Sequence, residues 1–205
     1  VALLGCVDSQ KLHMIYGLSD GGNHKIIVTY SDLKARELYE DCLLYDQNVV
    51  VFPAKDLIFF QADVHGNQLV MERMKCYRKL LEKKNVTVIT TFSSLMTPQI
   101  PLSVLTDHMV KIDQKSTIHE KKLAAKLVVM GYENNFQVEA PGQFSIRGGI
   151  IDIFDLTEEN PYRIELWGDE VESIRSFDVL SQRSIETKKE ITIYPATEMI
   201  LEESA

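Results

Sequence analysis

The spacing of apolar residues changes near Pro98–Pro101, and this change constrains the fold more than any other feature of the chain. Before it, strand-like runs of apolar and β-branched residues alternate with segments of helical spacing at 31–45 and 70–84. The runs lie at 1–5, 26–28, 49–52 and 86–92. Strands without polar interruption, alternating with helices, are typical of a parallel sheet covered on both faces. We therefore predict an α/β domain over residues 1–104.

After this point, apolar and polar residues alternate, as in strands with one buried face. The alternation is clearest at 144–146, 151–153 and 162–166, and turn-forming pairs interrupt it. A capping box at 117–120 predicts a helix that ends at Met130, with Gly131 as its cap. We predict an inserted α+β domain with an antiparallel sheet over residues 105–190. A strand at 191–194 would then open a segment, 191–205, that returns toward the first domain or leads onward.

Composition excludes several classes of function. Of the 205 residues, 45% are apolar and 25% are charged, which is enough for one or two domains with apolar cores. The formal net charge of -8 argues against a main DNA-binding surface, because such a surface needs a basic face. No run of 18 apolar residues occurs, so we expect a cytoplasmic protein with no membrane partner. The chain begins at Val1 without an initiator Met, and we interpret it as part of a longer protein.

The residues that most often bind metals form no recognisable site. Cys6, Cys42 and Cys76 are far apart and odd in number, so we expect reduced thiols, buried in the fold. The five histidines show neither the spacing of metal ligands nor a partner nucleophile. We therefore predict no metal site and no catalytic residue.

One segment has the position and part of the sequence of a phosphate-binding loop. The run Gly5-Cys-Val-Asp-Ser-Gln-Lys-Leu12 lies between a predicted strand and a predicted helix, where G-x-x-x-x-G-K-[ST] loops occur. Gly5 and Lys11 have the required spacing. However, Gln10 replaces the second glycine, and Leu12 replaces the hydroxyl residue that ligates Mg²⁺. The segment is either an ordinary strand–turn–helix or a decayed phosphate loop, and neither interpretation predicts a working ATP site.

Alternation in the second domain gathers two arginines and the sole tryptophan on one face of the sheet. In the run 162–167 the apolar residues face the core, so Arg163 and Trp167 face away from it. The same pattern over 144–147 places Arg147 on that outer face. Arginine and tryptophan are enriched at binding hot spots, and arginine can bind carboxylates through two hydrogen bonds. Either this face binds a partner, or the arginines pair with glutamates of the chain and Trp167 packs beneath a loop or a neighbouring domain.

Longer motifs in the same domain resemble one known family. They are Phe144–Phe154 (Phe-Ser-Ile-Arg-Gly-Gly-Ile-Ile-Asp-Ile-Phe), Tyr162–Arg175 and Phe177-Asp178, preceded by Gly131-Tyr132 and Pro141-Gly142. In combination they are similar to the UvrB-like module, which is shared by the excision-repair protein UvrB and the transcription-repair coupling factors. The resemblance is close over residues 108–196 and looser over the first domain.

Two departures favour the coupling factors over UvrB. UvrB has an intact phosphate loop, whereas the loop from Gly5 to Leu12 is altered. UvrB also carries a long tyrosine-rich hairpin that clamps DNA, and here only a short stretch joins Phe52–Asp56 to the predicted helix at Val70. The run Ser181–Ser184 is also more similar to the coupling factors. A UvrB-type ATP-dependent subunit that processes DNA damage stays the alternative hypothesis.

The resemblance implies both a fold and a function. The fold would be a degenerate P-loop, helicase-like parallel-sheet domain with the inserted α+β domain. The fragment would recruit UvrA, the damage-recognition ATPase, to stalled RNA polymerase. The positions that match the family's UvrA contact are Arg147, Arg163 and Trp167, with Trp where relatives often have Phe. The fragment itself would have no ATPase activity and no cofactor, because ATP, Mg²⁺, RNA polymerase and DNA would bind to parts of the longer protein outside it.

Overall fold

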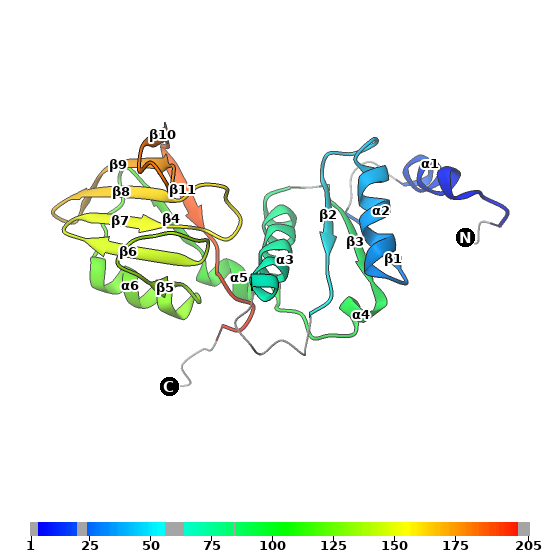
Figure 1. Cartoon of the computed structure of the whole chain (residues 1–205), viewed down its shortest axis with the longest axis horizontal. Helices are drawn as coiled ribbons and strands as arrows, with labels where there is room; N and C mark the ends of the chain where they lie inside the picture. Colours follow the sequence, from blue (N-terminus) through cyan, green and yellow to red (C-terminus); the bar gives the residue numbers. More distant parts are fainter. Residues whose placement is uncertain (1–3, 20–23, 56–63, 84, 201–205) are drawn as a thin grey trace. The chain divides into compact units, whose positions relative to one another are not determined.

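The computed structural model describes residues 4–19, 24–55, 64–83 and 85–200, and the chain divides into two compact units, residues 1–99 and 100–205 (Figure 1). One unit contains a parallel sheet, and the other is built on a mainly antiparallel sheet. The predicted combination of α/β and α+β architecture is therefore confirmed. Within the described residues, no helix is both long and apolar enough to cross a membrane.

The first unit is a three-stranded parallel sheet with helices on both faces (Figure 1). The strand order is β1-β3-β2, and Thr87 of the central strand pairs with Lys25 on one side and Val49 on the other. Its elements are α1 (Asp8–Leu18), β1 (Lys25–Thr29), α2 (Asp32–Cys42), β2 (Val49–Phe52), α3 (Val64–Glu82), β3 (Thr87–Thr91) and α4 (Phe92–Leu95).

Three helices and the sheet form the core of the first unit. Leu12 of α1 and Ala35 of α2 pack with Ile89 of the central strand. On the opposite face, Phe52 of β2 meets Tyr77 of α3 edge to face, with ring centroids 5.3 Å apart. The apolar strand residues are thus covered from both sides, as uninterrupted apolar strands require.

The start of this unit differs from the prediction. Residues 1–3 lie outside the described part, and Leu4, 92% exposed, belongs to no strand. Helix α1 follows Val7 without a side-chain cap, and Asp8 and Ser9, whose residue types often cap helices, lie inside the helix. By contrast, α2 lies within the predicted helical segment 31–45, and the Ser31 hydroxyl caps it by accepting from the Lys34 N–H at 3.2 Å.

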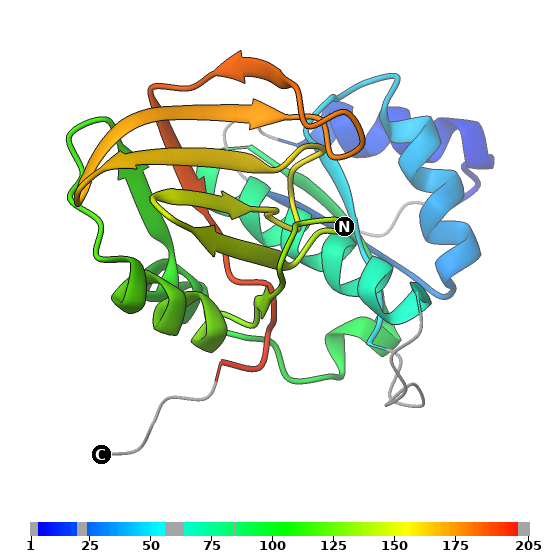
Figure 2. The ribbon, with the colours of Figure 1, turned by 60° about the vertical axis from the view of Figure 1, so that its left-hand side comes forward.

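The second unit is built on a six-stranded sheet, shown in Figure 2. The strand order is β10-β9-β8-β7-β6-β5, and only the β5–β6 pair is parallel. Its elements are α5 (Leu102–His108), β4 (Val110–Asp113), α6 (Glu120–Val129), β5 (Glu133–Asn134), β6 (Gln143–Arg147), β7 (Ile150–Ile153), β8 (Tyr162–Trp167), β9 (Glu170–Phe177), β10 (Ser184–Thr187) and β11 (Glu190–Ile193).

One face of the six-stranded sheet is covered within the unit. Ile151, Ile164 and other buried residues of this face pack against Leu127 of α6. The antiparallel pair β4–β11 covers the same face through Ile112 and Ile191. The expected strand at 191–194 therefore forms, but it pairs inside the second unit. The segment 191–205, which we expected to return to the first unit or lead onward, begins as part of this core.

Helix α6 begins later than its capping box predicts and ends as predicted. Thr117 bridges to Glu170 and the Ile118 N–H donates to Asp169 O at 2.7 Å, so these residues are extended, and His119 takes the N-cap position. At the other end Gly131 adopts a φ of 89°. The Tyr132 N–H reaches Leu127 O at 3.0 Å, which completes a Schellman motif.

Candidate protein-binding face

The sheet face opposite the core carries a row of polar side chains. Cross-strand pairing aligns Ser145 of β6 with Asp152 of β7, Asp152 with Arg163 of β8, and Arg163 with Arg175 of β9. Because side chains alternate across a strand, all four project from the same face. Arg147, two residues after Ser145, lies on this face as well. The structure thus places both predicted arginines together on the outer face.

Asp152 joins the two predicted arginines. Its carboxylate accepts from Arg163 Nε at 2.7 Å and from Arg163 Nη2 at 2.8 Å, and it accepts from Arg147 Nη2 at 3.0 Å. Only 1% of the Asp152 side chain is exposed. The hydrogen bond to Asp152 raises the pKa of Arg163 above its ordinary value. The predicted internal pairing of the arginines with glutamates is wrong for these two residues, since a buried aspartate takes that role.

A second ion pair extends the row. Arg175 Nη2 donates to Glu165, which also accepts from the Ser173 hydroxyl at 2.9 Å. The Nε–H of Arg175 is buried without a hydrogen-bond partner. A buried donor without a partner is unusual and energetically unfavourable. Arg175 is thus held through Nη2, while its buried Nε–H makes no hydrogen bond.

Two exposed aromatic side chains belong to this face. Trp167 ends β8 and is 80% exposed, so it does not pack beneath a loop of the second unit. Phe136 is 84% exposed, and the Arg147 guanidinium lies 5.6 Å from its ring centroid. The Ser145 hydroxyl donates to Phe136 O at 2.8 Å and fixes the backbone there. The sequence prediction did not include Phe136, because it lies in a loop where alternation assigns no face.

Asp152 was also missing from the predicted site, although the signal was available. In Ile-Ile-Asp-Ile, the isoleucines at 151 and 153 face the core, so alternation places Asp152 beside Arg147 and Arg163. We refer to Phe136, Arg147, Asp152, Arg163 and Trp167 as the arginine face.

The predicted remnant of a phosphate loop lies in α1 and the residues before it. Leu12 is only 3% exposed and belongs to the core of the first unit. Gln10 and Lys11 are exposed and helical, and the Gln10 N–H already donates to Val7 O at 2.9 Å. A phosphate loop needs free backbone amides and a hydroxyl ligand for Mg²⁺. Gln10 and Leu12 supply neither in this conformation.

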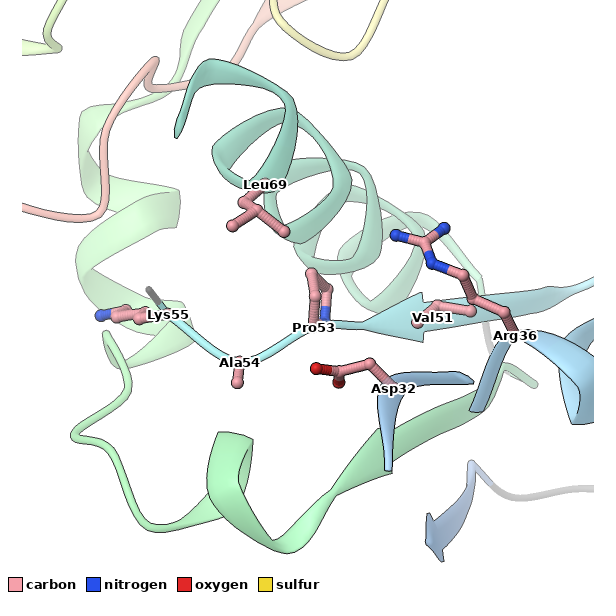
Figure 3. Close-up of a pocket in the computed structure, with 7 residues that line it drawn as sticks. All are labelled: Asp32, Arg36, Val51, Pro53, Ala54, Lys55 and Leu69. Atoms are coloured by element: carbon pink, nitrogen blue, oxygen red, sulfur yellow. The ribbon is translucent and has the colours of Figure 1, made fainter. Parts of the chain in front are cut away.

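A small pocket of about 280 Å³ lies at the carboxyl end of β2 (Figure 3). Its cationic side chains are engaged within the first unit. Arg36 Nη2 pairs with Glu72 at 3.2 Å, and Lys55 Nζ donates to Pro98 O at 3.2 Å. The lining residues are Asp32, Arg36, Val51, Pro53, Ala54, Lys55 and Leu69.

The described residues contain no group of three or more His, Cys, Asp or Glu side chains arranged to hold a metal ion. The three cysteines are free thiols. Cys42 and Cys76 are buried as predicted, and Cys6 is half-buried. Burial raises the pKa of Cys76 to about 12, so its reactive thiolate form is strongly disfavoured.

Comparison with known proteins shows which proteins the second unit and the chain are similar to. Residues 110–199 match the UvrB interaction domain family. The chain is 39% identical to the transcription-repair-coupling factor of Bacillus subtilis over 177 residues, which are 85% of this chain and 15% of that protein. It is 32% identical to the corresponding protein of Staphylococcus aureus over 202 residues, which are 97% of this chain and 17% of the relative.

The chain thus spans about a sixth of the length of these curated relatives. Its match to the UvrB interaction domain contains every residue of the arginine face. The resemblance drawn from the sequence motifs is confirmed: residues 110–199 match the UvrB interaction domain family, and most of the chain is similar to the corresponding region of the transcription-repair-coupling factors.

Proposed function

We propose that this fragment recruits UvrA for transcription-coupled repair and that the arginine face is the contact surface. The observation that carries the proposal is an exposed sheet face with Arg147 and Trp167 inside a match to the UvrB interaction domain family. In the UvrB-like resemblance, Arg147, Arg163 and Trp167 are the positions of UvrA contact. No other described surface combines exposed arginine and tryptophan, because Trp167 is the only tryptophan of the chain.

The chemistry of the face fits an acidic partner surface with an apolar recess. Arg147 is 36% exposed and keeps donors for a carboxylate. The Trp167 ring presents a large apolar area that water now covers, and its burial would contribute to affinity.

RNA polymerase and DNA would then bind through the rest of the longer protein. The first unit derives, in this proposal, from a P-loop helicase-like domain that has lost its nucleotide site. Its parallel sheet and the spacing of Gly5 and Lys11 support that origin, and the burial of Leu12 supports the loss. ATP and Mg²⁺ would belong to motor domains outside this fragment.

Calorimetric titration of the chain with UvrA tests the proposal directly. The wild type is expected to bind, and the triple variant Arg147→Ala, Arg163→Ala, Trp167→Ala is expected to bind at least about 100-fold more weakly. Undiminished binding by a correctly folded triple variant would refute the site assignment.

A separate titration with labelled ATP tests whether the first unit keeps a nucleotide site. We expect no saturable binding and no difference between the wild type and Lys11→Ala. Saturable binding that Lys11→Ala abolishes would instead favour the UvrB-type alternative.

A further inference from the structure

Asp152 is a charged residue in a position where charge is normally avoided. Its side chain is 1% exposed, and a buried carboxylate is tolerated only when it is paired and hydrogen-bonded. Two arginines meet this requirement through three hydrogen bonds. A single arginine with two hydrogen bonds would already neutralise the charge, so the second arginine calls for another explanation.

The two arginines are held very differently. Arg163 is 17% exposed, gives both Nε and Nη2 to Asp152, and shares Nη2 with the Gln182 side chain at 2.8 Å. Its guanidinium also lies 4.2 Å from the Phe177 ring centroid. Most of its recognition capacity is therefore used inside the unit.

Arg147 is held at one point only. It is 36% exposed, and its single hydrogen bond within the described residues runs from Nη2 to Asp152. Its Nε and Nη1 donors stay available for a partner. One fixed nitrogen and a neighbouring Phe136 ring limit the directions that this long side chain can take.

We propose that Asp152 is a positioning residue that holds Arg147 toward a carboxylate of the partner, while Arg163 orients the Asp152 carboxylate and contributes to binding mainly through it. This inference rests on the proposed UvrA contact and divides its arginines into one contact residue and one clamp. Ordering Arg147 before binding lowers the conformational entropy that association would otherwise remove.

The direction in which one substitution changes the affinity for UvrA distinguishes a positioning role of Asp152 from a purely electrostatic one. Asp152→Asn removes a negative charge from a face that would meet an acidic surface, so electrostatics alone predicts tighter binding. Positioning predicts weaker binding, because an amide oxygen holds a guanidinium less firmly than a carboxylate does. The two explanations therefore predict changes in opposite directions.

The decisive experiment is a double-mutant cycle on UvrA affinity with Asp152→Asn and Arg147→Ala, measured in the whole chain. We expect Asp152→Asn to weaken binding about tenfold in the wild type and less than about twofold when Arg147 is already alanine. Arg163→Lys keeps the positive charge beside Asp152 but loses the pair of hydrogen bonds from the guanidinium. We expect it, like Asp152→Asn, to weaken UvrA binding only when Arg147 is present. It supplies the test if Asp152→Asn does not fold.

Asp113→Asn is the matched control. It removes the same charge from the exposed end of β4, a strand that covers the opposite face of the six-stranded sheet, and we expect unchanged affinity. Tighter or unchanged binding by folded Asp152→Asn overturns the inference, and so does equal weakening in both backgrounds. If Arg147→Ala binds UvrA as tightly as the wild type does, the proposed contact itself is refuted. If Arg147→Ala weakens binding but Asp152→Asn does not change it, the contact stands and only the positioning role of Asp152 is refuted.

Discussion

We expect the side chain of Trp167 to contribute to partner binding but little to the stability of the fold. Because the side chain is 80% exposed, we expect acrylamide to quench its fluorescence readily, and Trp167→Ala to leave the thermal unfolding midpoint nearly unchanged. If Trp167 is a hot-spot residue, Trp167→Ala should weaken UvrA binding about 30-fold, or about 2 kcal/mol. Phe92→Ala removes another exposed aromatic, from the first unit, and should leave the affinity unchanged. Equal effects of the two substitutions would contradict the assignment.

Tyr132 predicts how the stability of the second unit depends on pH. Burial, and secondly Asp155, raise the pKa of this tyrosine well above its ordinary value, and its hydroxyl donates to Tyr194 O at 2.7 Å. The folded state thus binds the phenolic proton more tightly than the unfolded state. The stabilisation that results from this raised pKa is fully present below about pH 10, the pKa of tyrosine in the unfolded state. It declines as the pH rises further.

Urea unfolding of the second unit at pH 8 and pH 10.5 measures this effect. We expect a lower free energy of unfolding at the higher pH, and a smaller difference between the two pH values in Tyr132→Phe. That variant should also be less stable at pH 8, because the Tyr194 carbonyl loses a buried hydrogen bond. Tyr30→Phe, at an 82% exposed site of the first unit, should change neither quantity.

For single residues, the local sequence pattern predicted which face of the sheet a side chain occupies, but not which residue it pairs with. The period of two was enough to place Arg147, Arg163 and Trp167 on the outer face. It does not specify which strands become neighbours, and Asp152 pairs with Arg163 only because β7 lies beside β8. The partner of a charged residue depends on this long-range strand order, so glutamates were expected where an aspartate stands.

Among the elements, the end of α6 gives the sharpest test of backbone geometry. Gly131 has a φ of 89°, and a Cβ added to it would lie 2.6 Å from Thr197 Cγ2 and 2.9 Å from Thr197 Cβ. The left-handed conformation costs an alanine about 1 kcal/mol, and the overlap adds about 1–3 kcal/mol. We therefore expect Gly131→Ala to lower the free energy of unfolding by about 2–4 kcal/mol in urea titrations.

Gly168→Ala separates these two contributions. Gly168 has a φ of 64°, but no atom lies within 4 Å of an added Cβ. Only the backbone penalty of about 1 kcal/mol should appear there. If Gly131→Ala and Gly168→Ala lower stability equally, the contact between the end of α6 and Thr197 does not contribute.

Elements with strong signals formed where the sequence predicted them. The predicted strand at 49–52 is β2, and α2 lies within the predicted helical segment 31–45. The errors lie at ends, where tertiary contacts decide. Residues 117–118 pair with residues 169–170, at the turn between β8 and β9, so α6 begins only after them. A local capping pattern carries no information about this long-range pairing.

At the scale of the whole molecule, the arginine face and the altered phosphate loop lie in different units. The arginine face and its hydrogen-bond partners lie between residues 136 and 182, inside the unit formed by 100–205. The altered phosphate loop lies in the other unit, residues 1–99. Each unit has an apolar core of its own, built on a separate sheet. Partner binding therefore needs only the second unit, if the arginine face is the contact.

Residues 100–205 expressed alone should consequently fold and bind UvrA. Their core contains α6 and residues of both sheets, so we expect cooperative thermal unfolding of the isolated segment. Its affinity for UvrA should lie within about twofold of that of the whole chain, and Arg147→Ala should weaken both equally. Residues 1–99 alone should not bind. A folded 100–205 segment without affinity would show that the first unit contributes contacts that the arginine face does not contain.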